Sequence, residues 1–156
     1  MKMYFHHMAI GRIGIAEEQD CITNLYFETD AVPQNAEMCE TEVIQEAFQQ
    51  LSAYLAGDLK TFSVPLAPHG TDFMLTVWKA LCEVPYGTTS SYRQIAVAAG
   101  KPKAARAIGM ANNRNPLPLF IPCHGIIGSD GRLVGYRGGL EVKKQLLELE
   151  KRNCAV

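Results

Sequence analysis

Residues 91–112, which read SYRQIAVAAGKPKAARAIGMAN, contain two short helical segments separated by a glycine and a proline. Ser90 or Ser91 can cap a helix over Tyr92–Ala99, and the proline lies near the start of a second helix over Lys103–Asn112. Two short helices joined by a glycine-containing turn are typical of a helix-turn-helix. The pattern alone is weak evidence for DNA binding, because many helical proteins contain such a corner.

The second of these helices has two distinct faces. At 100° per residue, one face should pack inward, and it contains Ala104, Ala107, Ile108 and Ala111. The opposite face should be exposed, and it contains Arg106, Gly109 and Asn113. A glycine inside a helix costs about 1 kcal/mol relative to alanine, which is tolerable where DNA must approach the backbone closely. The alternative is that Gly109 merely lets another helix pack nearby.

The remaining segments predict an α+β protein. Strands are expected at Met3–Ile10, Arg12–Ala16 and Cys21–Thr29. Further helices are expected over 40–55, from Thr71 or Asp72 to Cys82, and over 140–150. Residues 63–70 contain two prolines and a glycine and form the best boundary. We therefore expect an N-terminal α/β domain over 1–66 and a second, helical domain over 70–156.

Composition excludes several classes of protein. The chain has 156 residues, of which 47% are hydrophobic and 20% charged, so it is not disordered, collagenous or a coiled coil. No apolar run approaches the roughly 20 residues that span a bilayer, and the first residues do not resemble a signal peptide. The five cysteines are odd in number, scattered and never in a C-x-x-C pair, which argues against disulfides and a zinc site. A reduced cytoplasmic protein is expected.

Charge is distributed unequally along the chain. Residues 1–80 carry four Lys/Arg against eleven Asp/Glu, a balance of −7, and residues 81–156 carry eleven against five, a balance of +6. A basic second half suggests a polyanion partner there, with nucleic acid the obvious candidate. A solvated surface with chance clustering is the alternative.

The segment Asn115–Gly125, which reads NPLPLFIPCHG, carries the candidate chemistry. Its three prolines exclude a helix and a central strand, so a stiffened, extended segment is expected. It ends in Cys123 and His124. A thiolate is a nucleophile, and an adjacent imidazole can take the thiol proton. A buried cysteine with only a packing role remains the alternative.

The last predicted helix places two charged residues on its apolar face. Its broad apolar arc contains Leu140, Val142, Leu146, Leu147 and Leu149, and Lys143 and Glu150 fall within this arc. Inward charges are costly unless they are paired or hydrogen-bonded. Glu150 is therefore a candidate to orient His124. Lys143 could bond backbone carbonyls of the site, or extend its ammonium group to the surface.

Four motifs together resemble the O(6)-alkylguanine-DNA alkyltransferases. They are Pro122-Cys123-His124, Arg106-Ala107-Ile108-Gly109, the stretch Val84–Tyr92 and the turn Gly135–Gly139. The resemblance runs from about Phe73 to Glu150. It implies a ribonuclease H-like N-terminal domain with a small antiparallel sheet and a winged helix-turn-helix domain.

The resemblance also implies roles for individual residues. Cys123 would accept the alkyl group, and His124 with Glu150, bridged by a water, would generate its thiolate. Tyr92 would help to rotate the damaged nucleotide and donate a hydrogen bond to the purine, and Arg106 would fill the gap in the duplex, beside Gly109. Further residues would bind the base or hold the site together: Asn115, Ile126, Tyr136, Arg137 and Lys143. Neither a metal nor another cofactor is implied.

The leading hypothesis is a DNA-repair enzyme that transfers the alkyl group from O(6)-alkylguanine, and from O(4)-methylthymine, to Cys123 once per molecule. It would act as a monomer on double-stranded DNA with alkylated bases, in the cytoplasm or associated with the nucleoid. Two departures from the family pattern, Gly125 after Cys-His and Arg137 in the Tyr-x-Gly-Gly turn, affect the surroundings of the nucleophile. A protein that only binds the lesion and a Cys-His-Glu hydrolase are the alternatives.

Overall fold

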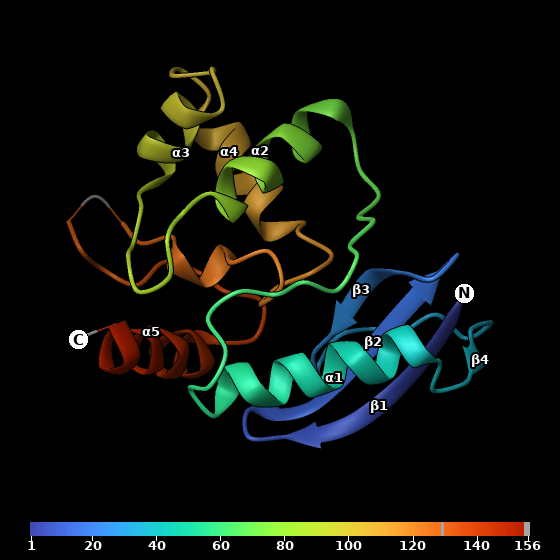
Figure 1. Cartoon of the computed structure of the whole chain (residues 1–156). Coiled ribbons are helices and arrows are strands. Elements are labelled where there is room, and N and C mark those ends of the chain that lie inside the picture. The colour runs from blue at the N-terminus through green and yellow to red at the C-terminus, as the bar shows by residue number, and fades with distance from the viewer. Residues whose placement is uncertain (129, 155–156) are drawn as a thin grey trace. The chain divides into compact units, whose positions relative to one another are not determined.

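The computed structural model describes residues 1–128 and 130–154. It divides into two compact units, Met1–His69 (unit 1) and Gly70–Val156 (unit 2), shown in Figure 1. Unit 1 has a four-stranded sheet in the order β3-β2-β1-β4. The strands are β1 (Lys2–Met8), β2 (Gly11–Glu18), β3 (Cys21–Tyr26) and β4 (Glu37–Met38). The first three strands are antiparallel, and β4 is parallel to β1.

Helix α1 (Glu42–Leu55) covers one face of this sheet and packs against β1, β2 and β3. Thr41 caps its first turn by accepting a hydrogen bond from the Ile44 N–H. The helix contributes four fully buried or nearly buried apolar side chains at helical spacing, Ile44, Ala47, Leu51 and Tyr54. These side chains meet the inner face of the sheet, so the core of unit 1 lies between one helix and one sheet.

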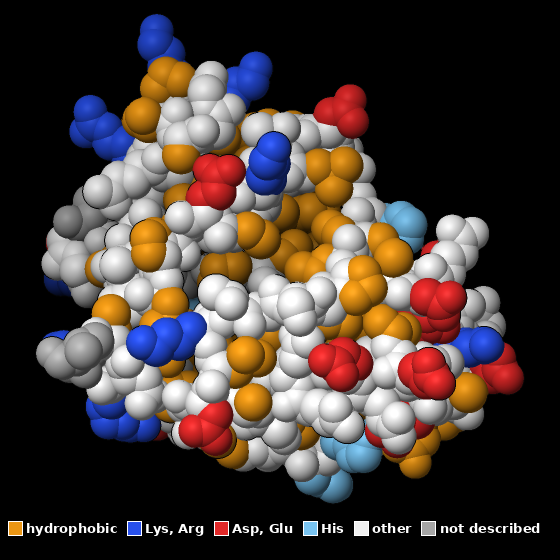
Figure 2. All heavy atoms as spheres, in the orientation of Figure 1, with side chains coloured by type: hydrophobic (Ala, Val, Ile, Leu, Met, Phe, Trp, Pro, Cys, Tyr) orange, Lys and Arg blue, Asp and Glu red, His pale blue; other side chains and the backbone are white. Residues whose placement is uncertain are grey.

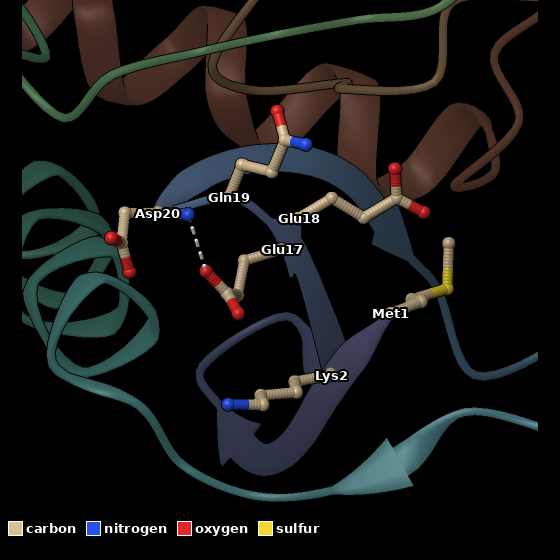
Figure 3. A pocket seen from close by; sticks show the side chains of 6 residues that line it. All are labelled: Met1, Lys2, Glu17, Glu18, Gln19 and Asp20. Atoms are coloured by element: carbon tan, nitrogen blue, oxygen red, sulfur yellow. Dashed lines mark hydrogen bonds between the residues drawn. The ribbon is translucent and has the colours of Figure 1, made fainter.

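An acidic hollow lies at the turn between β2 and β3, and Figure 3 shows the six residues that line it. Glu17 accepts a hydrogen bond from the Asp20 N–H at 3.0 Å and closes the turn. Gln19 and Asp20 have φ of 51° and 62°, a conformation that a tight hairpin turn requires. Three carboxylates and Lys2 line this surface, so it disfavours a polyanion.

Gln50 joins α1 to the segment that follows it. Its side-chain oxygen accepts hydrogen bonds from the Ser63 N–H at 2.9 Å and the Val64 N–H at 3.3 Å. Its amide nitrogen donates to Ser63 Oγ at 2.9 Å and to Glu46 at 2.8 Å. Because Val64 is buried, its N–H depends on this acceptor.

We expect Gln50→Ala to lower the free energy of unfolding by about 1–3 kcal/mol, because a buried donor loses its acceptor. Gln49→Ala is the matched control, since Gln49 is the exposed neighbour in the same helix. Urea denaturation followed by circular dichroism measures both variants. Equal unfolding midpoints for the two would show that the Gln50 bonds contribute nothing.

Unit 2 is helical. Helices α2 (Asp72–Cys82), α3 (Tyr92–Ala98) and α4 (Ala105–Asn113) pack against one another, and α5 (Leu140–Cys154) follows a long irregular segment. The buried Trp78 of α2 donates from its indole N–H to the Ala111 carbonyl of α4 at 2.9 Å. Gly70 lies so close to the Trp78 ring that a Cβ there would come within 2.5 Å of it.

Helices α3 and α4 form the predicted helix-turn-helix. Ser91 and Gln94 make a reciprocal capping box at the start of α3. Gly100 ends the helix with φ of 76°, which favours glycine. After α4, Ile127 and Leu133 form an antiparallel bridge, the small β element of a winged helix-turn-helix. The predicted α+β architecture is therefore confirmed.

Several predicted details were wrong. The short strand β4 was not predicted. Strand β3 ends at Tyr26, before the predicted end at Thr29, because the Phe27 N–H donates a hydrogen bond to the Asp30 carboxylate instead of pairing with a strand. Helix α5 continues past Glu150 to Cys154. Ala107 is exposed, because the buried stripe of α4 runs through Ile108, Ala111 and Asn112. Leu140 is 50% exposed because it is the first residue of α5. Among the described residues, no helix is long and apolar enough to cross a membrane.

Candidate active site

Cys123 lies at the start of the short 3-10 helix η1 (Cys123–Gly125), just after Pro122. All five cysteines are free, and Cys123 is the buried one, with 4% of its surface exposed. A cavity of about 10 Å³ lies beside it, lined by Asn112, Asn113, Asn115, Pro118, Cys123, Gly135, Tyr136 and Arg137. A space of this size holds about one water molecule, so the lining must open before anything larger reaches the thiol.

Asn115 holds the loop that leads to Cys123. Its side-chain oxygen accepts from the Leu117 N–H, and its amide nitrogen donates to the Ile121 carbonyl, both at 2.9 Å. The Ile121 N–H in turn donates to the Leu117 carbonyl at 2.8 Å. Leu119 has φ of 76°, a left-handed conformation that is unfavourable for a residue other than glycine. The predicted extended segment is therefore wrong: the prolines exclude a helix, but the loop folds tightly around Asn115.

His124 and Glu150 form a buried pair. The His124 Nε2 and a Glu150 carboxylate oxygen are 2.5 Å apart, and the two residues are 1% and 6% exposed. The other carboxylate oxygen accepts from the Gly87 N–H at 2.9 Å. The contact is direct, whereas the resemblance implies a water between the two side chains. Glu150 therefore fixes the imidazole next to Cys123 in the chain.

Lys143 is buried in α5 and does not extend to the surface. Its ammonium nitrogen donates to the Ile126 carbonyl and, at 3.0 Å, to the Val134 carbonyl. Burial lowers the pKa of Lys143 to about 8, while negative charge on Cys123 acts in the opposite direction. Lys143 thus joins the segment that contains Ile126 to the segment that contains Val134. The Ile126 carbonyl bonds Lys143, and the Ile126 N–H donates to the Cys123 carbonyl at 3.3 Å, so the base-binding role predicted for Ile126 needs the second lone pair of its carbonyl.

The electrostatics of the site keep the Cys123 thiol protonated at neutral pH. Burial raises the pKa of Cys123 to about 11, although a hydrogen bond from Asn115 and the charges of Arg137 and Lys143 lower it in part. Arg137 Nη1 also donates to the Asn115 carbonyl at 3.2 Å, which places the guanidinium at the cavity. Since the thiolate is the nucleophilic form, any reaction of Cys123 as a nucleophile requires a base to remove the thiol proton.

Tyr92 and Gly109 lie together between α3 and α4. A Cβ at Gly109 would be 3.8 Å from the Tyr92 ring, which is ordinary contact, so Gly109 is half-buried rather than on a fully exposed face. Burial and negative charge on Cys123 raise the pKa of Tyr92, and a hydrogen bond with Asn112 lowers it. Arg106 is exposed, as predicted.

The second aromatic residue of the site, Tyr136, lines the cavity next to Arg137. Burial and the charge of Cys123 raise its pKa well above the usual value. The structure thus places four predicted residues at one cavity, Cys123, Asn115, Tyr136 and Arg137. His124 on η1 and Glu150 and Lys143 on α5 do not line it. Tyr92 is linked to the cavity through Asn112.

Gly87 and Asn112 are among the residues of the site that were not predicted. Gly87, with φ of 79°, brings its N–H to Glu150. Asn112 lines the cavity and is 5% exposed. A signal for Asn112 existed, because it lies four residues after the buried Ile108 and hence on the same face of α4.

Exposed basic side chains cluster on α3, α4 and the turn between them. They are Arg93, Lys101, Lys103 and Arg106. Figure 2 shows blue side chains at the end of unit 2 where α3 and α4 lie. A surface of this charge attracts a polyanion. Among the described residues, no three His, Cys, Asp or Glu side chains are grouped so that they could hold a metal ion.

Comparison with known proteins identifies relatives of both units. Residues 1–68 match the 6-O-methylguanine DNA methyltransferase, ribonuclease-like domain, and residues 72–152 match the 6-O-methylguanine DNA methyltransferase, DNA binding domain. The methylated-DNA–protein-cysteine methyltransferase of Methanosarcina barkeri is 59% identical over 109 residues, covering 70% of this chain and 69% of the relative. The constitutive enzyme of Bacillus subtilis is 48% identical over 149 residues, 91% and 90% of the two chains.

Solved structures agree with these sequence relatives. The crystal structure of Mycobacterium tuberculosis OGT in complex with DNA superposes with a TM-score of 0.93 at 41% identity, over 98% of this chain and 94% of that one. A ribonuclease-like unit followed by a helix-turn-helix unit defines a class of DNA-binding, DNA-repair methyltransferases. The chain belongs to the 6-O-methylguanine DNA methyltransferase family.

We expect Lys143→Met to lower the free energy of unfolding by about 1–3 kcal/mol, because two carbonyls lose their donor in a buried site. Lys144→Met, at the exposed neighbouring position of α5, should change it by less than about 0.5 kcal/mol. Chemical denaturation of both variants is the measurement. A loss of the same size in both would mean that the carbonyl bonds do not stabilise unit 2.

Proposed function

We propose that this protein repairs DNA by transferring the alkyl group of O(6)-alkylguanine, and of O(4)-methylthymine, to its own Cys123. The observation that carries the proposal is the position of Cys123, which is buried beside a narrow cavity in the unit that contains the helix-turn-helix. The names of the relatives, methylated-DNA–protein-cysteine methyltransferases, support the same reaction. The partner is double-stranded DNA carrying alkylated bases, and the protein acts as a monomer.

The reaction requires a thiolate that the resting site does not hold. His124, oriented by Glu150, takes the proton from the Cys123 thiol. The sulfur then forms a bond to the alkyl carbon, and the bond from that carbon to the base oxygen breaks. Its electron pair stays on the base, which takes up one proton and becomes unmodified guanine or thymine. The thioether on Cys123 is stable, so each molecule reacts once.

The closed position of Cys123 requires the damaged base to leave the DNA stack. A base inside a duplex cannot reach an enclosed thiol, and its extrusion costs a few kcal/mol. Arg106, exposed on α4 among other basic residues, fills the gap that the base leaves. Tyr92 guides the rotating nucleotide and donates a hydrogen bond to the base, while Tyr136 and Arg137 form the cavity wall next to it.

Residues of the site also point to a cellular setting. A free cysteine that acts as the acceptor must remain reduced, and its substrate is DNA, so we place the protein in the cytoplasm or on the nucleoid. A protein that binds lesions without repairing them would need no such cysteine. A Cys-His-Glu hydrolase would convert many substrate molecules per protein molecule, instead of reacting once. Neither alternative uses the cysteine and the helix-turn-helix together.

Exposure to duplex DNA that contains O(6)-methylguanine should add one methyl group to each protein molecule, on Cys123. Intact mass spectrometry and peptide mapping measure this transfer. Cys123→Ala should abolish transfer and leave DNA binding intact, because the basic residues of α3 and α4 remain. Cys82→Ala, at an exposed cysteine, is the control and should transfer normally. A methyl group found chiefly on another cysteine would overturn the assignment, and binding without transfer would favour the lesion-binding alternative.

Arg106→Ala should slow transfer from duplex DNA by about 10- to 100-fold, because extrusion loses the side chain that offsets a few kcal/mol of unstacking. The free base O(6)-methylguanine needs no extrusion, so its reaction with Cys123 should fall by less than about threefold.

Arg93→Ala, at another exposed arginine of the same surface, is the matched control: it should weaken DNA binding, but at saturating DNA it should leave the transfer rates from duplex and free base unchanged. Equal losses of rate on duplex and free base for Arg106→Ala would mean that Arg106 supports the fold or the thiolate instead.

A further inference from the structure

The sheet of unit 1 has one edge that is covered and one that is partly open. At the first edge, β3 exchanges two backbone hydrogen bonds of 2.8 Å with the segment around Leu66. At the second edge, the short strand β4 pairs with Lys2 and Met3, the first two residues of β1 (Figure 1). Residues 5–8 of β1, called the β1 edge from here on, therefore continue beyond β4.

The backbone groups of the β1 edge that point away from β2 have no partner among the residues that the structure describes. The Met3 carbonyl accepts from the Cys39 N–H at 3.0 Å on this side of β1. Because these directions alternate along a strand, Phe5 and His7 also present their N–H and C=O groups to this side. Neither residue makes a backbone hydrogen bond there. A row of such groups is a template for a further extended chain.

The β1 edge also lacks the features that protect open strand edges in natural proteins. Lysine, proline, a β-bulge or a covering segment usually serves this purpose. Residues 5–8 read FHHM, without lysine or proline, and β1 pairs with β2 from end to end without a register shift. His7 is exposed. The β1 edge is therefore accessible to another strand.

A groove beside the β1 edge can receive side chains of such a strand. It has a volume of about 510 Å³, within the range of about 300–1,000 Å³ that is typical of ligand clefts, and it is lined by the end of β1, by Glu40 and by α1. The rings of His6 and Phe48 meet edge-on in it, with centroids 4.4 Å apart. Glu40 Oε1 lies 2.9 Å from His6 Nε2. The groove thus offers both an aromatic contact and a carboxylate.

Charge indicates which kind of chain fits this edge. Residues 1–69 carry three Lys/Arg against ten Asp/Glu, a balance of −7. Glu40 pairs with His6, and no lysine or arginine of the described residues pairs with it. A positively charged segment is attracted by this surface, whereas DNA and a second copy of unit 1 are repelled.

We propose that the β1 edge binds an extended, positively charged segment of a partner protein, which joins the sheet as a strand and places a Lys or Arg side chain beside Glu40. Main-chain hydrogen bonds to Phe5 and His7 supply affinity, and the groove supplies selectivity for side chains. This interaction is separate from the reaction of Cys123, because no residue of the groove lines the cavity beside that cysteine.

The test is a titration of the isotope-labelled full chain with the end-capped peptide Val-Thr-Lys-Thr-Val-Thr-Lys, followed by NMR of the backbone amides. Its β-branched residues favour an extended chain, and its valines and lysines share one face. Signals of β1 and α1 should shift, and hydrogen exchange at the Phe5 and His7 amides should slow at least about tenfold at saturation. The matched peptide Val-Thr-Glu-Thr-Val-Thr-Glu should bind at least about tenfold more weakly, because its carboxylates meet Glu40.

His7→Pro tests the backbone contact. Proline removes an N–H that faces away from β2, so the pairing of β1 with β2 remains while the peptide loses a donor. The affinity for the lysine peptide should fall at least about tenfold. His7→Ala keeps this N–H and is the matched control, with an expected change of less than about threefold.

Glu40→Gln tests the charge contact and should weaken binding of the lysine peptide about two- to fivefold. Glu42→Gln is the control, because Glu42 is exposed nearby and does not line the groove. Its affinity should equal that of the unmodified protein.

Two results with the unmodified protein would overturn the proposal, even if His7→Pro does not fold. They are shifts centred outside β1 and α1, and amides of Phe5 and His7 that exchange equally fast with and without peptide. Equal affinity for the two peptides would refute the preference for positive charge. A dimer in analytical ultracentrifugation that His7→Pro abolishes would assign the edge to a second copy instead. Methyl transfer to Cys123 should be unchanged in all four variants, so a failure of the proposed function is recognised separately.

Discussion

The bond between Glu150 and His124 is the interaction on which the arrangement of unit 2 depends. One carboxylate oxygen contacts the imidazole of η1, and the other accepts the N–H of Gly87 in the loop before α3. Lys143, two turns earlier on the same helix, bonds the carbonyls of Ile126 and Val134. Removing one partner of such a buried hydrogen bond leaves the other polar group unsatisfied, which is destabilising. Helix α5 is therefore the support that holds the cysteine loop and the start of the helix-turn-helix in one geometry.

Much of this arrangement could be predicted from the sequence because it depends on local patterns. The helix-turn-helix followed from the capping serines and the Gly-Lys-Pro break, and the inward positions of Lys143 and Glu150 followed from helical periodicity. Each of these two patterns is local, because it depends on residues that are close together in the sequence. The α+β class followed from strand-like and helical patterns in succession.

The features that the sequence did not predict depend on contacts between distant residues. Strand β4 consists of two residues, and its pairing with β1 bridges more than thirty positions. The loop before Cys123 was predicted to be extended because prolines exclude helices, but proline says nothing about side-chain bonds such as those of Asn115. Asn112 was missed because a polar residue is expected to face solvent, although its spacing from Ile108 places it inside.

The resting state of Cys123 has a consequence for the lifetime of the protein in a cell. Oxidation by peroxide, and exchange with other thiols and disulfides, select cysteines that are exposed and carry thiolate character. Cys123 has neither property at rest, since it is 4% exposed and its pKa is raised to about 11. If Cys123 accepts an alkyl group once, as we propose, any such side reaction would inactivate the protein. Under the proposed function, the closed, neutral thiol keeps the nucleophile unreacted until an extruded DNA base enters the cavity.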